Sequence, residues 1–328
     1  MAAIPPAPPV LALSPKIPDH EVASRLAQSL RRRTGQFLCG FPSTRPPASA
    51  ITLGNAKFLS LPEAAALVED LDVVGFAGVG GHAPSTGFVR ALAERFEASE
   101  ALMTPKQLTL LAPGGETTLD PLLEAPGLVA KLFTSHLGAH PAAAARMGAP
   151  PTGNVAALEV HVLPRGAFSL CVARMATDGA NSYACAAGVG TAVYDPRCGG
   201  GTARTAGVKD EYVRCEEDGS LRYFAPLPTV AVVNAAAADA KGNVYARGAS
   251  APADAAELAA AAALNGGRVV AVVAFVVPEG YGPILVPAAR VSAVVVDRTL
   301  EQGFGALHVA PWPFLVAPNA AADADTGG

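Results

Sequence analysis

The sequence has few aromatic and few charged residues. Among its 328 residues, 6% are aromatic and 16% are charged, whereas 51% are hydrophobic, many of them alanine. The formal net charge of −4 gives no electrostatic reason to expect binding to nucleic acid. No apolar run reaches the ~18 residues of a membrane-spanning helix, and the longest, Val269–Val277, suits a buried strand. We therefore expect a soluble globular protein that binds neither nucleic acid nor a membrane.

Cysteine is also scarce, and its spacing excludes two common uses. The five cysteines are Cys39, Cys171, Cys185, Cys198 and Cys215. They form no C-x-x-C pair and no metal-ligand spacing with the six histidines. An odd, scattered set is typical of a reducing compartment, so we expect free thiols and no metal site.

Short apolar runs alternate with segments of helical period. Strands are expected at residues 71–76, 108–111, 158–162, 230–233, 269–277 and 293–296, and helices at 86–99 and 253–264. Asn265-Gly266-Gly267 supplies a suitable end to the second helix. Strands separated by helices predict an α/β fold with a mostly parallel, open sheet flanked by helices.

The two ends of the chain differ in composition from its middle. Residues 1–52 begin rich in proline and continue with a short amphipathic stretch that ends at Arg31–Arg33. An Arg-rich amphipathic segment is typical of organelle targeting, whereas the prolines and early acidic residues favour a disordered leader. Residues 306–328 end in alanine, aspartate and glycine and are expected to be disordered. This leaves residues 53–305 as one domain and either a cytoplasmic or a mitochondrial location.

A glycine-rich stretch, Gly188–Thr202, surrounds one acid–base pair. Asp195 and Arg197 flank Pro196, which stiffens the turn. The arginine offers a planar fork of donors for a carboxylate or phosphate. Glycine lets a backbone approach a ligand closely, so we expect a ligand-binding loop, with an ordinary surface loop as the structural alternative. The glycines are Gly188, Gly190, Gly199, Gly200 and Gly201.

A second glycine loop, Gly75–Pro84, connects an expected strand to an expected helix. Such a turn can hold a phosphate at the start of the helix. It also fits the dinucleotide fingerprint G-x-G-x-x-A, although Pro84 occupies the helix entry and the next acids, Glu97 and Glu100, fall at the helix end. Tight packing of helix on strand would explain the same glycines. The glycines of interest are Gly78, Gly80 and Gly81.

Several segments together resemble one enzyme family. Besides Gly188–Thr202, they are Lys57–Leu92, Leu128–Gly138, Val160–Arg174, Leu227–Val244 and Asn265–Asp297. In this order they resemble family I CoA-transferases, the acetate, propionate and 3-oxoacid group. The resemblance covers about residues 57–300. It is closest to the α-like half of the long, fused-subunit enzymes.

The resemblance implies a ping-pong transfer of CoA between an acyl-CoA thioester and a short-chain carboxylate. A glutamate carboxylate attacks the thioester, CoA thiolate leaves, and the thiolate then attacks the acyl-enzyme anhydride to give a glutamyl-CoA thioester. An acceptor carboxylate reverses both steps. CoA is a substrate, and no permanently bound cofactor is required. Each tetrahedral intermediate needs an oxyanion site.

The resemblance also implies residues for CoA and substrate binding. From the two glycine loops these are Gly78, Gly80, Gly81, Gly188, Gly190, Asp195, Arg197 and Gly200, and from Leu163-Pro164-Arg165-Gly166 they are Arg165 and Gly166. The family usually has glutamine where this chain has Arg165. A cation therefore replaces a neutral amide beside the reacting thioester, where it would stabilise an oxyanion or grip a carboxylate.

In the family, the nucleophilic glutamate belongs to the β-like half. The resemblance assigns this chain to the α-like half, so it implies that the glutamate comes from elsewhere. Glu301-Gln302-Gly303 mimics the nucleophile motif, but it follows the last strand of the α-like half, so we interpret Glu301 as coincidental. We expect activity beside a glutamate-bearing β-type partner, and self-association of the isolated chain through its uncovered apolar face.

The histidines and an Asp-Gly-Asn turn are expected to have structural roles. His136 matches a family position and is expected to be structural or to line the pocket, whereas His82 and His140 are expected to be exposed. Asp239, Gly242 and Asn243 are expected to form a tight turn between two strands.

Three hypotheses remain from the sequence. The first is an α-type half of a CoA-transferase. The second is a degenerate or truncated homologue that binds acyl-CoA or a partner protein without catalysis. The third is an NAD(P)-dependent oxidoreductase built on the first glycine loop, which leaves the Asp195-Pro196-Arg197 stretch unexplained.

Overall fold

The computed structural model describes residues 57–79, 85–99, 102–115, 118–147, 157–245 and 254–297. The expected leader at 1–52 and tail at 306–328 lie outside these residues, as do Gly80, Gly81, His82 and Glu301.

The main sheet has ten strands in the described residues and is mostly parallel, as the sequence predicts. Its parallel strands lie in the order β1-β13-β11-β9-β2-β3-β4-β5. Their bounds are β1 Lys57–Leu59, β2 Val73–Phe76, β3 Leu108–Ala112, β4 Val129–Thr134, β5 Glu159–Val162, β9 Val230–Asp239, β11 Arg268–Val277 and β13 Ala293–Val296. Strands β10 (Val244–Tyr245) and β12 (Ile284–Val286) extend β9 as an antiparallel addition.

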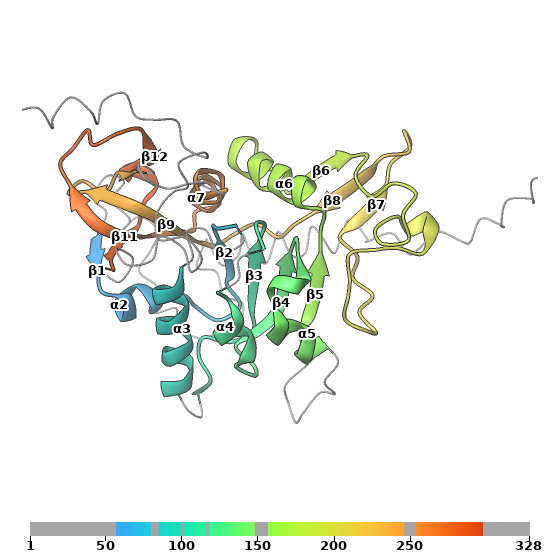
Figure 1. Cartoon of the computed structure of the whole chain (residues 1–328), viewed down its shortest axis with the longest axis horizontal. Coiled ribbons are helices and arrows are strands. Elements are labelled where there is room, and N and C mark those ends of the chain that lie inside the picture. The colour runs from blue at the N-terminus through green and yellow to red at the C-terminus, as the bar shows by residue number, and fades with distance from the viewer. Residues whose placement is uncertain are drawn as a thin grey trace, which may run out of the picture.

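Helices cover both faces of this sheet (Figure 1). One face carries α2 (Leu61–Ala65), α3 (Thr86–Ala98), α4 (Asp120–Glu124) and α5 (Pro141–Met147). The other carries α6 (Arg165–Thr177), α7 (Ala255–Leu264) and a small antiparallel sheet of β6 (Ser182–Cys185), β8 (Leu221–Phe224) and β7 (Val213–Cys215). Short 3-10 turns lie at Leu137–Ala139, Pro196–Cys198 and Ala288–Arg290. None of the described helices is both long and apolar enough to cross a bilayer.

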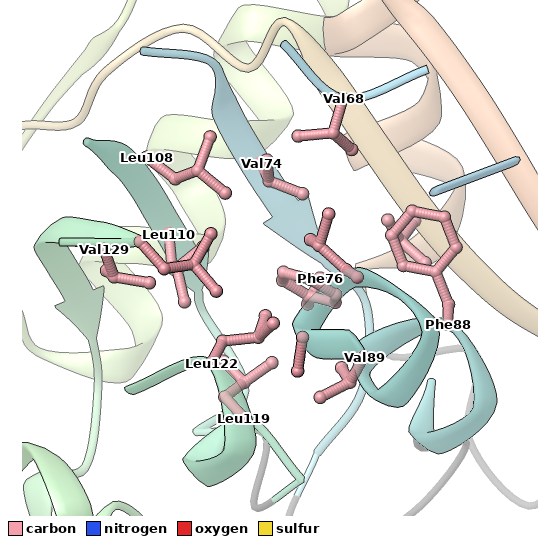
Figure 2. Packing of buried hydrophobic residues seen from close by; sticks show 14 of the residues in the cluster. Val68, Val74, Phe76, Phe88, Val89, Leu108, Leu110, Leu119, Leu122 and Val129 are labelled. Atoms are coloured by element: carbon pink, nitrogen blue, oxygen red, sulfur yellow. The ribbon is translucent and has the colours of Figure 1, made fainter. Parts of the chain in front are cut away.

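The core has two layers because the parallel strands are buried on both faces. In Figure 2, Phe76 and Leu110 from neighbouring strands meet Phe88 and Val89 of α3 and Leu122 of α4. Intervening strand residues belong to the opposite layer, under α6 and α7. The period-2 alternation of a strand thus serves two cores, which explains why these strands read as continuous apolar runs.

Strand β9 is longer than the sequence indicates. The apolar pattern predicts a strand over 230–233, but the structure extends it through Asn234 and four alanines to Asp239. Every residue of β9 is buried, between β11 on one side and β2 and then β10 on the other. Alanine has a low intrinsic strand preference, and burial among neighbouring strands outweighs it here.

The turn after β9 forms as expected from Asp239, Gly242 and Asn243. The Asp239 carboxylate accepts hydrogen bonds from the backbone of Lys241 and Asn243, from Asn243 Nδ2 at 2.8 Å and from Tyr245 Oη at 2.8 Å. Burial opposes ionisation of this carboxyl, but these donors hold its pKa below the usual range. Asp239 therefore organises the turn that joins β9 to β10.

The order of strands reverses between β2 and β9. The chain builds outward from β2 through β3, β4 and β5 on one side, then returns to place β9, β11 and β13 on the other. At such a switch point the loops after neighbouring strands diverge, and open α/β sheets bind ligands in the resulting crevice at the carboxyl ends of the strands. A ligand site is therefore expected at the carboxyl edge of this sheet.

The two-layer core gives a stability prediction. Leu110 is fully buried in β3, and Leu110→Ala should reduce the free energy of unfolding by ~2–5 kcal/mol through lost burial and a residual cavity. Leu264, at the end of α7, is 58% exposed and serves as the control for the same substitution. The free energy of unfolding of Leu264→Ala should stay within about 0.5 kcal/mol of the parent value. Urea unfolding of both variants measures this, and equal losses would contradict the assignment of the core.

Candidate functional site

Two glycines at the carboxyl edge of the sheet are in backbone contact with each other. Gly78 follows β2 and Gly114 follows β3. A Cβ atom on Gly114 would overlap the carbonyl oxygen of Gly78 and lie 2.8 Å from Nη1 of Arg165. Glycine is therefore required at 114 by the close approach of two backbones. We call Gly78 and Gly114 the glycine shelf.

Arg165 reaches the glycine shelf from the first residue of α6. Pro164 ends the loop after β5 and leads directly into the helix. The guanidinium Nη2 lies 3.2 Å from Oδ2 of Asp254, an ion pair without the alignment of a hydrogen bond. Nη1 is buried against Gly114 and has no hydrogen-bond partner, although the side chain as a whole is 41% exposed.

The ion pair brings two helix N-termini together. Arg165 is the first residue of α6, and Asp254 directly precedes α7. Neither N-cap, Pro164 or Asp254, provides a side-chain hydrogen bond to its own helix. Uncapped N-termini present free backbone N–H groups and a partial positive charge. A Cβ on Gly166 would meet nothing within 4 Å, so space remains beside the first turn of α6.

The structure gathers only some of the residues that the sequence analysis selected for this site. Gly78, Arg165 and Gly166 come together, whereas Gly80 and Gly81 fall outside the described residues. Sequence reasoning missed Gly114 and Asp254. Pro113-Gly114-Gly115 directly after a strand was an available signal for the first. The second had none, because its role depends on how α7 packs beside α6.

The glycine-rich stretch at 188–202 lies elsewhere, against β7 and β8 of the small sheet. Gly188 packs on Tyr223 of β8, whose hydroxyl donates to the Ala187 carbonyl at 2.6 Å. Cys215 of β7 lies 3.9 Å from the Asp195 carboxylate through its sulfur. Figure 1 shows the small sheet beside α6, away from β2.

Asp195 and Arg197 form an ion pair with each other. The buried carboxylate accepts from Nε and Nη2 of Arg197 at 2.9 and 2.8 Å, and also from the backbone N–H of Arg197 and Gly190. The arginine hydrogen bonds hold the pKa of Asp195 at about 2. Gly200 lets the returning chain touch the backbone of Tyr194 and Asp195. The Arg197 guanidinium, which we expected to bind a ligand, therefore binds Asp195 within the same loop. These internal hydrogen bonds fix the shape of the loop in the absence of a ligand.

The exposure of His136 and His140 differs from what the sequence predicts. His136 is exposed beside Gly138, on the loop after β4. His140, which we expected to be exposed, is instead fully buried: it directly precedes α5, and its Nε2 lies 3.1 Å from Thr134 Oγ1 at the end of β4. Burial, with a smaller contribution from His136, lowers its pKa to about 4. A neutral, buried His140 is structural.

A further buried histidine, His161, escaped the sequence analysis. It stacks on Phe133 and lies 2.7 Å from a Glu159 oxygen through Nε2. Lys131 also contacts Glu159 at 2.6 Å. Burial opposes ionisation of Glu159, but the hydrogen bonds from His161 and Lys131 outweigh it and lower the pKa. Because β5 is the last strand of the sheet, this cluster holds the chain near Thr202 against an otherwise open edge.

The start of α3 does not suit a dinucleotide. The carboxylate of Asp297, directly after β13, lies against Gly87 in the first turn of the helix, where a Cβ would collide with it. A dinucleotide fingerprint needs this helix N-terminus for a pyrophosphate. A buried carboxylate in that place repels an anion, which disfavours the NAD(P) interpretation.

Comparison with known proteins identifies the fold. No protein-family model matches the chain, and no curated protein matches it in sequence. The acyl-CoA transferase YdiF from E. coli O157:H7, solved as a thioester complex with CoA, matches 78% of this chain with 25% identity and a TM-score of 0.65. The chain spans only 49% of YdiF, about half the length of that enzyme.

Two smaller proteins match over most of their own length. Glutaconate coenzyme A-transferase from Acidaminococcus fermentans shares 14% identity with a TM-score of 0.52, covering 79% of this chain and 82% of its own. A cysteine-to-serine variant of the decarboxylase AibA/AibB shares 20% identity with a TM-score of 0.52, covering 79% and 89%. The structure thus matches family I CoA-transferases, and its α/β architecture is CoA-transferase-like.

The closed loop around Asp195 gives a prediction about pH. Because its pKa is lower in the folded protein, Asp195 stabilises the fold above pH ~4, and this contribution of about 2 kcal/mol is lost as the pH falls toward 2. Asp195→Asn should lower stability at neutral pH and flatten the acid limb of a denaturant-midpoint profile. Asp178→Asn, which breaks an exposed Arg–Asp pair on α6, is the control. Matching profiles for the two variants would contradict this role.

The glycine shelf gives a second prediction, about shape. Gly114→Ala should destabilise the protein by roughly 1–3 kcal/mol, because the added methyl group forces the loops after β2 and β3 apart. Gly166→Ala places the same methyl group in open space within a helix and should stabilise by ~0.5–1 kcal/mol. Thermal and urea unfolding compare them. Equal tolerance at both positions would show that the two backbones are not in contact.

Proposed function

We propose that this chain is one half of a CoA-transferase, which moves CoA between an acyl-CoA thioester and a short-chain carboxylate. One observation carries the proposal. The fold of an acyl-CoA transferase, matched over half the length of YdiF, brings a glycine shelf, two uncapped helix N-termini and Arg165 together at the carboxyl edge of the sheet.

This arrangement suits a thioester more than a bulky or strongly anionic group. Gly78 and Gly114 pack backbone against backbone, so the loops after β2 and β3 close tightly beside Arg165. The helix N-termini and Arg165 offer donors to an oxygen that gains negative charge during attack. Asp254 balances the positive charge of Arg165, which disfavours a large polyanion at this spot. The nucleophilic glutamate comes, in this proposal, from a β-type partner half.

The preformed loop around Asp195 and Arg197 is assigned a binding role away from the reacting centre. Its shape is fixed by internal hydrogen bonds, so contact with a ligand would cost little ordering. We assign Gly188, Gly190, Asp195, Arg197 and Gly200 to a rigid surface for the remote part of CoA or for the partner half. Binding energy from such a remote contact drives the reacting centre.

A chain that binds acyl-CoA or a partner protein without catalysis is the alternative. The arginine at position 165, where a glutamine is expected, and the run of buried alanines in β9 favour it. Both functions share the fold and the site, so an activity measurement separates them.

The test is acyl exchange from propionyl-CoA or acetoacetyl-CoA to acetate. The chain is assayed alone and then with a β-type subunit, and a glutamyl-CoA adduct is trapped for peptide mass mapping. We expect transfer only with the partner present, with the adduct on the partner. Transfer by the chain alone with the adduct on Glu301 would overturn the assignment of the nucleophile. No transfer by a folded sample in either case would leave the binding function.

A further inference from the structure

We propose that the exposed loop after β6 is a docking surface for the β-type partner half. We call residues 186–193 the docking loop, which reads Ala-Ala-Gly-Val-Gly-Thr-Ala-Val and leads into the 3-10 turn at Pro196–Cys198. This docking role rests on the proposed function and deepens it, because two occupants, the remote part of CoA and the partner half, are there assigned to the same surface.

The docking loop is exposed, apolar and uncharged. Seven of its eight residues are exposed, and only Gly188 is half-buried. Val189 and Val193 expose 41% and 53% of their surface. No charged residue lies between Asp178 and Asp195. Exposed apolar residues that gather on one loop indicate an interaction site, and the cores of protein interfaces are depleted in charged residues.

The backbone of the docking loop finds hydrogen-bond partners within the protein. Its carbonyl groups accept from neighbouring N–H groups, from Tyr223 Oη at 2.6 Å and from Arg204 Nη2 at 3.2 Å. The N–H of Gly190 donates to the Asp195 carboxylate at 2.7 Å. Because these groups are satisfied without water, a partner surface can cover them at little cost of desolvation. Because they also fix the shape of the loop, binding needs little further ordering.

The charges beside the docking loop favour a protein over CoA as its occupant. CoA carries phosphate groups, which bind best to cations with free donors. Arg197 is balanced by Asp195. Both Nη atoms of Arg204 are bound to backbone carbonyl groups, and its guanidinium stacks over the Tyr194 ring at 5.4 Å. An uncharged protein surface therefore complements the docking loop better than a polyanion does.

The half-length match to YdiF favours the partner half as the protein that covers this loop. The chain spans 49% of YdiF, so the other half of that enzyme has no counterpart in the match. In the proposed function, that counterpart is the β-type half. Permanent interfaces are more apolar than transient ones, and a preformed, uncharged loop suits a permanent contact.

The experiment measures how much β-type subunit the chain needs. The full chain is titrated with the subunit in the acyl exchange from acetoacetyl-CoA to acetate, and binding of the two chains is measured separately by sedimentation velocity. Val193→Asp puts a carboxylate on the docking loop, where an apolar partner surface would leave it buried and unpaired. We expect the half-saturating subunit concentration and the Kd to rise at least ~10-fold. The KM for acetoacetyl-CoA at saturating subunit should stay at the parent value.

Val276 of β11 provides the matched control. It is 49% exposed, so Val276→Asp makes the same change on a side chain of similar exposure. Figure 1 shows β11 and β7 at opposite ends of the molecule, and this variant should behave as the parent. Circular dichroism checks the fold of each variant. Should Val193→Asp not fold, Val193→Thr replaces one methyl group by a hydroxyl and should raise the Kd about fivefold.

The outcomes separate the docking role from the proposed function. Transfer at the same subunit concentration for the parent and Val193→Asp, or an equal loss for Val276→Asp, would overturn the docking role and leave the proposed function intact. A raised KM for acetoacetyl-CoA with an unchanged subunit titration would assign the loop to CoA instead. Binding without transfer, weakened by Val193→Asp, would support the docking role while the proposed function fails. If the folded parent neither transfers nor binds the subunit, both fail.

Discussion

The parallel pairing of β2 with β9 is the contact on which the rest of the structure depends. It joins two strands that are far apart in sequence, and it sets the point where the strand order reverses. Because the sheet is covered on both faces, its polar loops can emerge only at the strand ends. The glycine shelf, Arg165 and Asp254 meet at the carboxyl edge for this reason, although they come from separate connections between strands and helices.

Ion pairs serve two different purposes in this protein. Asp195 with Arg197, and Glu159 with Lys131 and His161, use nearly all their hydrogen-bonding capacity internally and hold loops or an edge strand in place. Arg165 with Asp254 is less complete, since one buried guanidinium nitrogen has no acceptor. Satisfied pairs of this kind stabilise the architecture, whereas the pair of Arg165 and Asp254 leaves two buried atoms, Nη1 and Oδ2, without a hydrogen bond.

The fold also restricts which functions are compatible with the site. A helix N-terminus after the first glycine loop would suit a pyrophosphate, but Asp297 places a carboxylate there. Between the starts of α6 and α7, by contrast, Arg165 and Asp254 form a pair whose charges balance. The match to YdiF extends over about half of that enzyme, so the partner half and the substrate pair belong to the proposal and not to the fold.

The sequence by itself determined the α/β class, most strand and helix positions and the turn at Asp239, because these follow from local periodicity and turn chemistry. It also selected Gly78 and Arg165, through segments that resemble CoA-transferases. It could not place Asp254 beside Arg165, extend β9 through its alanines, or show that Arg197 closes on Asp195. Those features depend on which strands become neighbours and what they bury. Such long-range contacts have no counterpart in the spacing of residues along the chain, so only the tertiary structure decided them.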